Sequence, residues 1–385
     1  MKLRVLLVTE SFLPSMNGVT NSVVKVLETY RKLGVEALVV APKSAGTPSE
    51  FLGFQVIQAR SLPFMQFPVA IPGFFLGPLM QSFEPDVVHV ASPFMLGAQA
   101  LMVAEQLGIP SVAIYQTDLA GYTDRYGLKF AKQTVDRMVA GIHSLATINL
   151  APTPDAETYL KQLGVQNVSG WGRGVDIDRY HPKRRELATT NLLRDEFCGE
   201  ADIVVGYVGR LAPEKRVDRF AELFGISPRV KFLLVGDGPE RTSLETHFAG
   251  QPVHFTGTLH GESLADAYAA IDVFVHFGTE ETFGQTIQEA QATGLAVVAP
   301  IQGGPRFLVE TEVSGLLVDA HKANSYQAAV TRLVADAELR ARLGEGARRA
   351  VLRKSWDENN LKLVRQYRQA IEMRRERLVR ELESV

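Results

Sequence analysis

DVFVHFGTEETFGQTIQEAQATGLAVVAP, at residues 272–300, reads as an apolar run of strand length, a turn, a helix that stops at Gly294 and a second apolar run. Two apolar strands joined by a helix are typical of a parallel sheet with crossover connections. The same alternation continues toward both ends of the chain. The sequence therefore predicts an α/β protein with doubly wound sheets.

Two sets of strands are predicted, one in each half of the chain. The apolar runs of the first half lie at 4–8, 36–41, 54–59, 86–90, 111–115 and 145–150. Those of the second half lie at 203–209, 230–236, 253–256, 272–276, 296–300 and 315–319. A helix is expected from about Val19, because one of its faces is apolar.

The repeated pattern divides the chain into domains. We predict an N-terminal domain (1–178), a linker (179–200), a C-terminal domain (201–355) and a final helix (356–385). The linker is assigned because it is rich in charge and has neither a helical nor a strand period. The final helix needs a surface to cover, because one face is apolar: Leu361, Val364, Tyr367 and Ile371.

Composition excludes several functional classes. The 385 residues carry 41 basic and 43 acidic side chains, a net charge of -2, which argues against a nucleic-acid partner attracted by bulk charge. The single cysteine, Cys198, cannot form an internal disulfide, and the first residues lack the apolar region of a signal peptide, so a cytoplasmic location is predicted. Residues 61–83 are uncharged, but four prolines argue against a membrane-spanning helix.

Two cations follow the first predicted strand of the second half. Arg210 and Lys215 lie in GRLAPEK (209–215), directly after that strand. Open parallel sheets bind ligands at the carboxyl ends of their strands, and two cations there suit a phosphate or diphosphate. Taken alone, such a pair is more often a solvated surface feature.

The turn within the opening segment carries a denser group of residues. Backbone N–H groups near Phe283, Gly284 and Gln285 would form an anion site strengthened by the helix dipole. Glu281 could accept hydrogen bonds from sugar hydroxyls, and Glu289, further along the helix, could hold a ribose diol. The alternative, a helix with ordinary acidic residues, does not explain a Phe-Gly pair between two acids.

Dinucleotide binding is the first hypothesis for two doubly wound domains. No G-x-G-x-x-G motif follows a predicted strand, and the first strand leads instead to a single glycine, Gly18, after Asn17. An Asn-Gly pair is usually a turn. The functional alternative is a helix start where a ligand approaches bare backbone N–H groups.

Together these motifs resemble those of the retaining GT-B glycosyltransferases of family four. The resemblance spans nearly the whole chain and rests on the order of five motifs: GRLAPEK (209–215), GDGPE (236–240), VHFTGTL (253–259), the paired glutamates of ETFGQTIQE (281–289) and GGP (303–305). The sequence is similar in particular to actinobacterial GDP-mannose-dependent alpha-mannosyltransferases acting on glycolipids. It is less similar to sulfoquinovosyl- and glucosyl-diacylglycerol synthases.

The resemblance implies a fold and a donor site. Two Rossmann-like domains would face each other across a cleft, and the final helix would cross back onto the first domain. Arg210 and Lys215 would bind the donor diphosphate and stabilise it as a leaving group. Glu281 would hydrogen-bond the sugar, and Glu289 would hydrogen-bond the ribose. The backbone of Phe283 and Gly284 would bind the phosphates. Gly18 would close over the diphosphate.

Two positions depart from the family pattern. Gln116 stands where many members have a histidine at the end of the fifth strand, and Gln is not suited to proton transfer. Gln116 could still hydrogen-bond the donor sugar, and Asp118 is the nearest ionisable substitute. His260 falls about where some GDP-mannose users have an Asp that reads guanine, so the choice of GDP over UDP stays open.

Neither a metal nor another cofactor is expected. DID (176–178) has the form of a metal-binding Asp-x-Asp pair, but it resembles the interdomain turn of the family, where Asp176 would brace the chain. Charge compensation by Arg210, Lys215 and a helix N-terminus would make a divalent ion unnecessary.

The uncharged segment 61–83 suggests an acceptor site, because the resemblance implies that the acceptor binds mainly to the first domain. An apolar surface for a lipid acceptor or the membrane interface would consist of Phe64, Phe67, Phe74, Phe75 and Leu76. A loop packed into its own domain is the alternative.

These observations predict a metal-independent retaining hexosyltransferase that acts by front-face displacement. The donor would be GDP-mannose and the acceptor a glycolipid such as a glucuronosyl-diacylglycerol, with the enzyme in the cytoplasm or peripherally on the inner face of the plasma membrane. No nucleic-acid partner is expected. The alternatives are a UDP-sugar-dependent glycosyl- or sulfoquinovosyl-diacylglycerol synthase, a sugar-nucleotide epimerase, a nicotinamide-dependent oxidoreductase and a non-catalytic lipid or sugar-nucleotide binding module.

Overall fold

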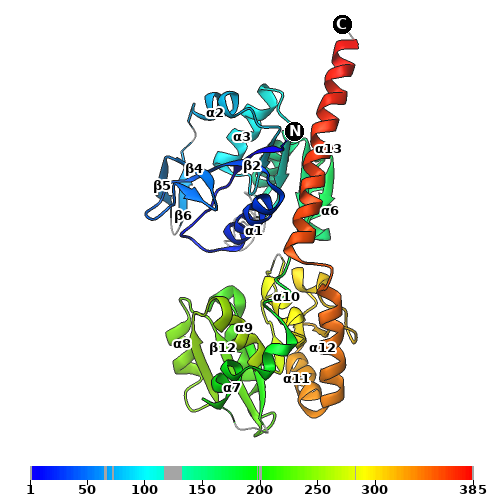
Figure 1. The fold of residues 1–385 in the computed structure, drawn as a ribbon. Coiled ribbons are helices and arrows are strands. Elements are labelled where there is room, and N and C mark those ends of the chain that lie inside the picture. Colours follow the sequence, from blue (N-terminus) through cyan, green and yellow to red (C-terminus); the bar gives the residue numbers. More distant parts are fainter. Residues whose placement is uncertain are drawn as a thin grey trace. The chain divides into compact units, whose positions relative to one another are not determined.

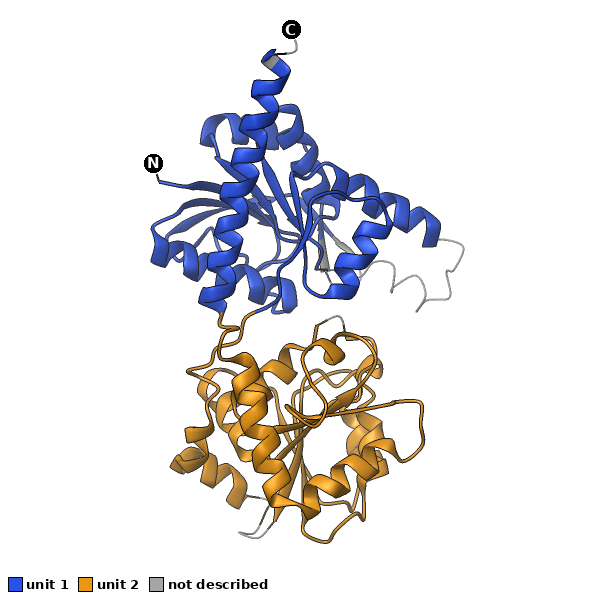
Figure 2. Cartoon of the chain, turned by 90° about the vertical axis from the view of Figure 1, so that its right-hand side faces the viewer, with its two compact units in different colours: residues 1–173, 356–385 blue, residues 174–355 orange. Residues whose placement is uncertain are grey.

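Parallel strands form two separate sheets, as the alternating sequence pattern predicts (Figure 1). The computed structural model describes residues 2–64, 67–71, 73–116, 132–196, 198, 202–281 and 283–383. The chain forms two compact units, residues 1–173 with 356–385 (unit 1) and residues 174–355 (unit 2) (Figure 2). The prediction of an α/β protein with two Rossmann-like sheets is confirmed.

Unit 1 contains an eight-stranded sheet in the order β10-β9-β8-β7-β1-β2-β4-β3, parallel except between β3 and β4. Its strands are β1 (Arg4–Val8), β2 (Glu36–Pro42), β3 (Glu50–Phe51), β4 (Phe54–Ala59), β7 (Val87–Val90), β8 (Ser111–Ile114), β9 (Ile148–Ala151) and β10 (Val168–Gly170). Its helices are α1 (Gly18–Leu33), α2 (Leu76–Phe83), α3 (Met95–Gln106), α5 (Lys132–Ser144), α6 (Pro154–Gln162) and α13 (Trp356–Glu383).

Unit 2 contains a six-stranded parallel sheet in the order β13-β12-β11-β14-β15-β16. Its strands are β11 (Ile203–Val208), β12 (Val230–Val235), β13 (Val253–Gly257), β14 (Val273–Val275), β15 (Ala296–Pro300) and β16 (Leu316–Val318). Its α-helices are α7 (Ala188–Asp195), α8 (Arg241–His247), α9 (Gly261–Ala270), α10 (Gln285–Ala292), α11 (Ser325–Ala335) and α12 (Ala337–Val351). Short 3₁₀ segments are η2 (Pro182–Glu186), η3 (Pro213–Lys215), η4 (Val217–Leu223) and η5 (Gly304–Phe307).

Both sheets are buried on their two faces, which explains why their strands are continuous apolar runs. In β11, Val205 and Tyr207 belong to one hydrophobic cluster, and Val204 and Val208 belong to the cluster on the opposite face. Alternate residues of β1 are divided between two clusters in the same way. The rigid sheets therefore fix the positions of the loops at their edges.

The prediction of a linker at 179–200 is wrong. The boundary between the two units falls between residues 173 and 174, and segment 179–200 belongs to unit 2. The segment contains η2 and α7, and arginines of both elements donate hydrogen bonds to residues of α9. Arg184 donates to Asp266, with Nη2 and Oδ1 2.7 Å apart, and Arg194 donates to the Ala270 carbonyl at 2.6 Å. Its charges, which suggested a solvated connection, are thus the groups that attach it to the domain.

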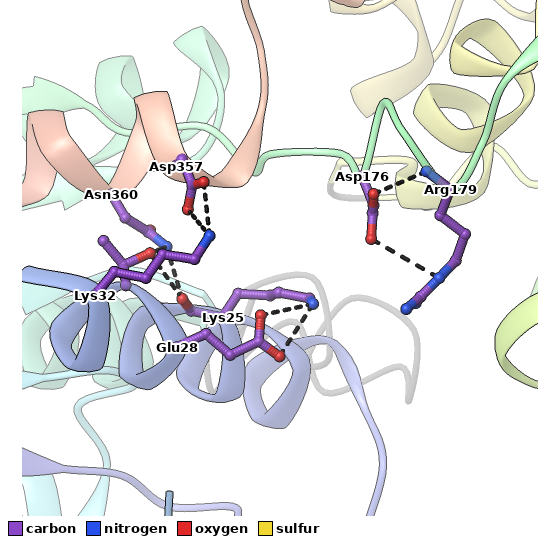
Figure 3. A network of polar contacts seen from close by, with 8 residues as sticks. Lys25, Glu28, Lys32, Asp176, Arg179, Asp357 and Asn360 are labelled. Atoms are coloured by element: carbon purple, nitrogen blue, oxygen red, sulfur yellow. Dashed lines mark hydrogen bonds and ion pairs between the residues drawn. The ribbon is translucent and has the colours of Figure 1, made fainter.

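The final helix packs on unit 1, as predicted, although its buried face differs in detail. Leu363, Val364, Tyr367 and Ala370 are buried, whereas Leu361, expected in the apolar stripe, is 41% exposed. Polar contacts fix the helix on α1, including two hydrogen bonds of 2.9 Å from Asn360 Nδ2 to the Lys25 carbonyl and Thr29 Oγ1 (Figure 3). Because α13 completes the core of unit 1, the last part of the chain belongs to the first domain.

The uncharged segment contains a two-stranded hairpin, β5 (Ser61–Phe64) and β6 (Phe67–Ala70), followed by α2. Phe64 and Phe67 are opposite each other in the hairpin, and their side chains lie outside the described parts. Phe74 is fully exposed, and Phe75 is half-buried against the core. Leu76 is buried, so its predicted place on an apolar surface is wrong, because it anchors α2 to the sheet. No described helix is long and apolar enough to cross a membrane.

Candidate functional site

The predicted donor-binding residues of unit 2 follow the carboxyl ends of its strands. Arg210 and Lys215 follow β11, and Glu281 follows β14. The strand order of this sheet reverses between β11 and β14, which is the place where open α/β sheets bind ligands. The structure thus places these three residues at the carboxyl edge of the sheet, where the sequence pattern predicts them.

Lys215 and Glu281 form an ion pair between Nζ and Oε2. Their side chains are 22% and 20% exposed. Partial burial weakens solvent screening and makes such a pair more than a surface contact. Two residues that are 66 positions apart in the chain thus meet at one point of the candidate site.

Glycines hold the loops of this edge close together. An added Cβ at Gly236 would overlap the Gly209 carbonyl, and one at Gly238 would overlap the Leu211 carbonyl, so GDGPE supports GRLAPEK. An added Cβ at Gly304 would lie 2.6 Å from the Phe283 nitrogen. These motifs therefore act through backbone packing that positions the charged residues.

Helix α10 presents its N-terminus at the same edge. Gly284, with a left-handed φ of 100°, precedes the helix, and no side chain caps it. The first N–H groups of a helix have no intrahelical acceptor, and no described residue accepts from those of Gln285 and Thr286, so they can bind an anion. The Gln285 side chain is used elsewhere, because Nε2 donates to the Gly174 carbonyl at 2.9 Å.

Arg210 is exposed and has no ion pair among the residues that the structure describes.

Glu289 lies further along α10 in a half-buried position. Its Oε2 accepts a hydrogen bond of 2.7 Å from the hydroxyl of Tyr268 on α9. Burial raises the pKa of this carboxyl to about 7, against the opposing effect of hydrogen bonds from Tyr268 and Tyr180. Its partial burial and its hydrogen bond with Tyr268 distinguish Glu289 from a solvated glutamate on a helix surface.

His260 is exposed at the start of α9, in the loop after β13. It therefore lies at the same edge of the sheet as the Lys215–Glu281 pair. Its role in reading the base of a nucleotide stays a prediction.

Gly18 and Gln116 come together in unit 1 around Arg173, which the sequence interpretation missed. The Arg173 guanidinium lies against Gly18, where an added Cβ would be 2.6 Å from Nη1. The Gln116 amide accepts from Arg173 at 3.5 Å and donates to the Ala91 carbonyl at 2.7 Å. Gly18 begins α1, and Asn17 caps that helix through bonds from the Val19 and Thr20 nitrogens. Its lack of a side chain thus leaves room for Arg173.

Asp118 and Asp176 complete the set of predicted residues. Asp118, the proposed substitute for a catalytic histidine, lies outside the described residues. Asp176 accepts a hydrogen bond of 3.0 Å from the Arg179 nitrogen, so it braces its own turn as predicted (Figure 3). Within the described ranges, no group of three or more His, Cys, Asp or Glu is arranged to hold a metal ion.

Two other residues at the carboxyl edges of the sheets could have been identified as site candidates from their positions after predicted strands. His276 ends the predicted strand 272–276, so the rule that identified Arg210 also applies to it. Glu10 follows β1, and its Oε1 accepts from the Gly97 nitrogen at 2.8 Å. Tyr268 carried no signal, because an aromatic residue within an apolar helix is normally part of the core.

Comparison of the chain with known proteins shows the family to which it belongs. Residues 16–179 match the model described as Glycosyltransferase Family 4, and residues 191–350 match the model described as Glycosyl transferases group 1. The chain is 42% identical over 362 residues to the GDP-mannose-dependent alpha-mannosyltransferase of Mycolicibacterium smegmatis, covering 92% of this chain and 94% of that protein. The chain belongs to the family-four glycosyltransferases.

More distant proteins are similar to the chain in sequence or in fold. The alpha-monoglucosyldiacylglycerol synthase of Acholeplasma laidlawii is 26% identical, with 77% of this chain and 80% of that protein covered. The crystal structure of Anabaena HepE in complex with UDP and glucose superposes with a TM-score of 0.75 at 22% identity, covering 95% of this chain and all of the other. This likeness confirms the predicted GT-B fold.

Family membership confirms that the chain is an enzyme, a hexosyltransferase. It decides against the oxidoreductase, the epimerase and the non-catalytic binding module that were considered as alternatives.

Proposed function

We propose that this glycosyltransferase transfers α-mannose from GDP-mannose to a glycolipid, with retention of the anomeric configuration. The observation that carries the donor site is the arrangement at the reversal point of the unit 2 sheet. There, Arg210, Lys215 and the N-terminus of α10 offer positive charge and N–H groups to a diphosphate. The 42% identical relative, which is named for GDP-mannose and α-mannosyl transfer, supports the choice of sugar and base.

In the proposed reaction, Lys215 and Arg210 stabilise the negative charge that develops on the departing nucleoside diphosphate. The acceptor hydroxyl attacks the anomeric carbon from the face that the diphosphate leaves, and the diphosphate takes up its proton. Glu281 accepts hydrogen bonds from the sugar hydroxyls. No metal ion is needed in this scheme, because the protein supplies the positive charge.

A lipid-linked acceptor is proposed for two reasons. The uncharged segment exposes several large apolar side chains, Phe74 fully, Leu62 to 61% and Ile71 to 42%, and exposed apolar surface is typical of a binding site. One relative over most of the chain is named as a diacylglycerol glycolipid synthase. A glucuronosyl-diacylglycerol is our specific proposal, with peripheral contact to the inner face of the plasma membrane.

A donor panel tests this function. Purified protein is incubated with a lipid extract and GDP-mannose, UDP-glucose or UDP-galactose, and the lipid product is analysed by mass spectrometry. We expect one added hexose with GDP-mannose and a rate at least tenfold lower with either UDP sugar. Preference for a UDP sugar would contradict the choice of base and favour the UDP-dependent glycolipid synthase alternative. Transfer to water-soluble sugars alone would contradict the lipid acceptor.

Replacing Glu289 with Gln tests the proposed ribose contact. At pH 8.5, where Glu289 is ionised, the KM for the donor is expected to rise about tenfold with little change in kcat, because a hydrogen bond to a charged group is replaced by one to a neutral group. Steady-state kinetics with varied donor measures this split. A fall in kcat at unchanged KM would contradict a ribose-binding role.

The same variant has a predicted pH signature in the absence of donor. The folded-state pKa of Glu289 is about 7 instead of 4.5, so its contribution to stability is present at low pH and is lost as pH rises through 7. Gln does not ionise and does not lose this contribution. We expect the variant to be more stable than the wild type at pH 8.5, by on the order of 2 kcal/mol, and similar at pH 5. Thermal melting at the two pH values checks the sign.

A further inference from the structure

A cavity lies in unit 1 at the amino edge of its sheet. It has a volume of about 510 Å³, a size that can hold a small ligand, and its walls come from α13, the end of α1 and the residues before β1, β2 and β7. Helix α1 begins at Gly18 beside Arg173 and ends at Leu33 in the cavity wall, 16 residues or about 24 Å away. The cavity is therefore separate from the carboxyl edge, where Gly18 and Gln116 lie.

The floor of this cavity is apolar and consists of Leu3, Leu33, Val35, Leu361, Val364 and Ile371. Leu33 and Leu361 are both exposed, although the sequence pattern predicts Leu361 in the buried stripe of the final helix. An added Cβ at Gly34 would meet no atom within 4 Å, so open space reaches the backbone at the end of α1. Apolar surface of the final helix is thus left open to a ligand at this place.

Four cations and one acid also line the cavity: Lys2, Arg365, Arg368, Arg375 and Asp86. Arg375 faces Glu372 at 3.8 Å, whereas the other three cations have no ion pair among the residues that the structure describes. The acid is already in use, because Asp86 Oδ2 accepts from the Arg4 nitrogen at 2.8 Å. The cavity therefore combines an apolar floor with an excess of positive charge.

This excess is local and does not extend along α13. Further along the same helix, Arg377 binds Glu381 at 2.9 Å, and Arg380 faces Glu376 at 3.5 Å. On α1, Lys32 binds Asp357 at 2.7 Å (Figure 3). The two arginines of α13 without a described ion pair are the two that line the cavity beside Lys2. Like charges held together repel one another, and a bound anion would offset this cost.

The cavity is also continuous with the uncharged segment of unit 1. Helix α2 ends at Phe83, whose ring lies under the Arg4 guanidinium at 4.8 Å, next to the residue that binds Asp86 through its backbone. The exposed Phe74 precedes the other end of α2, a helix of 8 residues or about 12 Å. A membrane surface is wide enough to contact both places, whereas a small soluble anion is not.

We propose that this cavity binds an acidic membrane lipid, with the lipid phosphate on Arg365, Arg368 and Lys2 and the beginning of its acyl chains on the apolar floor. Guanidinium groups match the geometry of a phosphate, and a neutral lipid would leave the cations without a partner. A free phosphate would leave the floor in water. The inference goes beyond the proposed function, because this lipid fixes the protein to a membrane and is not the acceptor.

Cosedimentation with vesicles tests the charge preference. The vesicles consist of phosphatidylcholine alone or of equal parts phosphatidylcholine and phosphatidylglycerol. Because each cation at an acidic membrane surface contributes about fivefold to binding, Arg365→Gln with Arg368→Gln is expected to weaken binding to the acidic vesicles at least about tenfold. Binding to neutral vesicles is expected to stay the same. Arg377→Gln with Arg380→Gln removes the same charge from the same helix and is expected to change either affinity less than about threefold.

A monomeric lipid tests the cavity itself. Short-chain phosphatidylglycerol below its micelle concentration is expected to protect Arg365 and Arg368 from modification by phenylglyoxal, as measured by mass spectrometry of the peptides. Inorganic phosphate at the same concentration is expected to give no protection. Leu361→Asn, a change at an exposed position, is expected to weaken the short-chain lipid about fivefold, because part of the apolar floor is lost.

Several results would overturn the proposal. An equal loss in the two double variants would show that the bulk charge of α13 attracts the vesicles. Equal protection by inorganic phosphate would show a site for a free anion, and equal binding to neutral vesicles would show apolar contact alone. Lipid binding is measured without donor, so absence of hexose transfer by the wild type would contradict the proposed function and leave this site intact. Transfer to a detergent-dispersed acceptor is expected to be normal in both double variants, which checks that they fold.

Discussion

Glu281→Ala is expected to lower kcat at least about 10³-fold while the protein stays folded. A group that orients the reacting sugar and faces developing charge contributes mainly in the transition state, and loss of one such contact costs about 10²–10³ in rate. Removal of the whole side chain also leaves Lys215 without its ion-pair partner. Transfer of radiolabelled mannose to lipid measures the loss, and circular dichroism checks the fold.

The same variant is expected to bind GDP more tightly than the wild type, although it is inactive. In the wild type, nucleotide has to displace the carboxylate from Lys215, and alanine removes this competition. Opposite changes in transfer rate and nucleotide affinity are hard to obtain from a general loss of structure. Full activity in Glu281→Ala would refute the assignment of the site.

Asp202→Ala is a matched control for this experiment. Asp202 is 19% exposed, close to the 20% of Glu281, and it faces Lys231 at 3.8 Å. It precedes β11 at the amino edge of the same sheet, away from the candidate site. Normal transfer by this variant would show that loss of a paired acid in unit 2 is not harmful in itself.

The second large effect is expected for Lys215→Met. This change keeps an unbranched side chain and removes the charge that stabilises the departing diphosphate. We expect kcat/KM for the donor to fall about 10²–10³-fold, mainly through kcat, because the negative charge increases as the bond to the sugar breaks. Steady-state kinetics at several donor concentrations separates the two parameters.

Lys231→Met is the corresponding control. Lys231 is 28% exposed, against 22% for Lys215, and lies near the amino end of β12. Its replacement is expected to change kcat/KM less than about twofold. If Lys215→Met raised only the KM, Lys215 would bind the ground state without contributing to catalysis, contrary to the proposed role.

Sequence patterns alone were sufficient for the two sheets and for the edge of unit 2 to which the proposed donor site is assigned. Buried parallel strands must be apolar along their whole length, so they appear as runs that need no knowledge of distant residues. Residues that follow such runs lie at the carboxyl edge in any parallel sheet. This is why Arg210, Lys215 and Glu281 could be identified before the fold was known.

Local patterns were insufficient where charged residues have distant partners. Segment 179–200 was predicted to be a linker because it is polar, yet Arg184 binds Asp266, which is 82 residues away. A charged side chain looks the same in a sequence whether it is solvated or paired. Leu76 shows the converse error, because an apolar residue in an uncharged segment does not reveal whether it faces solvent or the core.

The sequence by itself determined the α/β architecture, the sheet edge at which Arg210, Lys215 and Glu281 lie and the residue types there that suit a diphosphate. These follow from periodicity and from chain order, which are local properties. The tertiary structure alone decided that Lys215 is held by Glu281, that Arg173 occupies the space left by Gly18, and that two arginines of the final helix without a described ion pair line one cavity. Pairing, burial and pKa depend on neighbours brought together by folding, and no spacing along the chain contains that information.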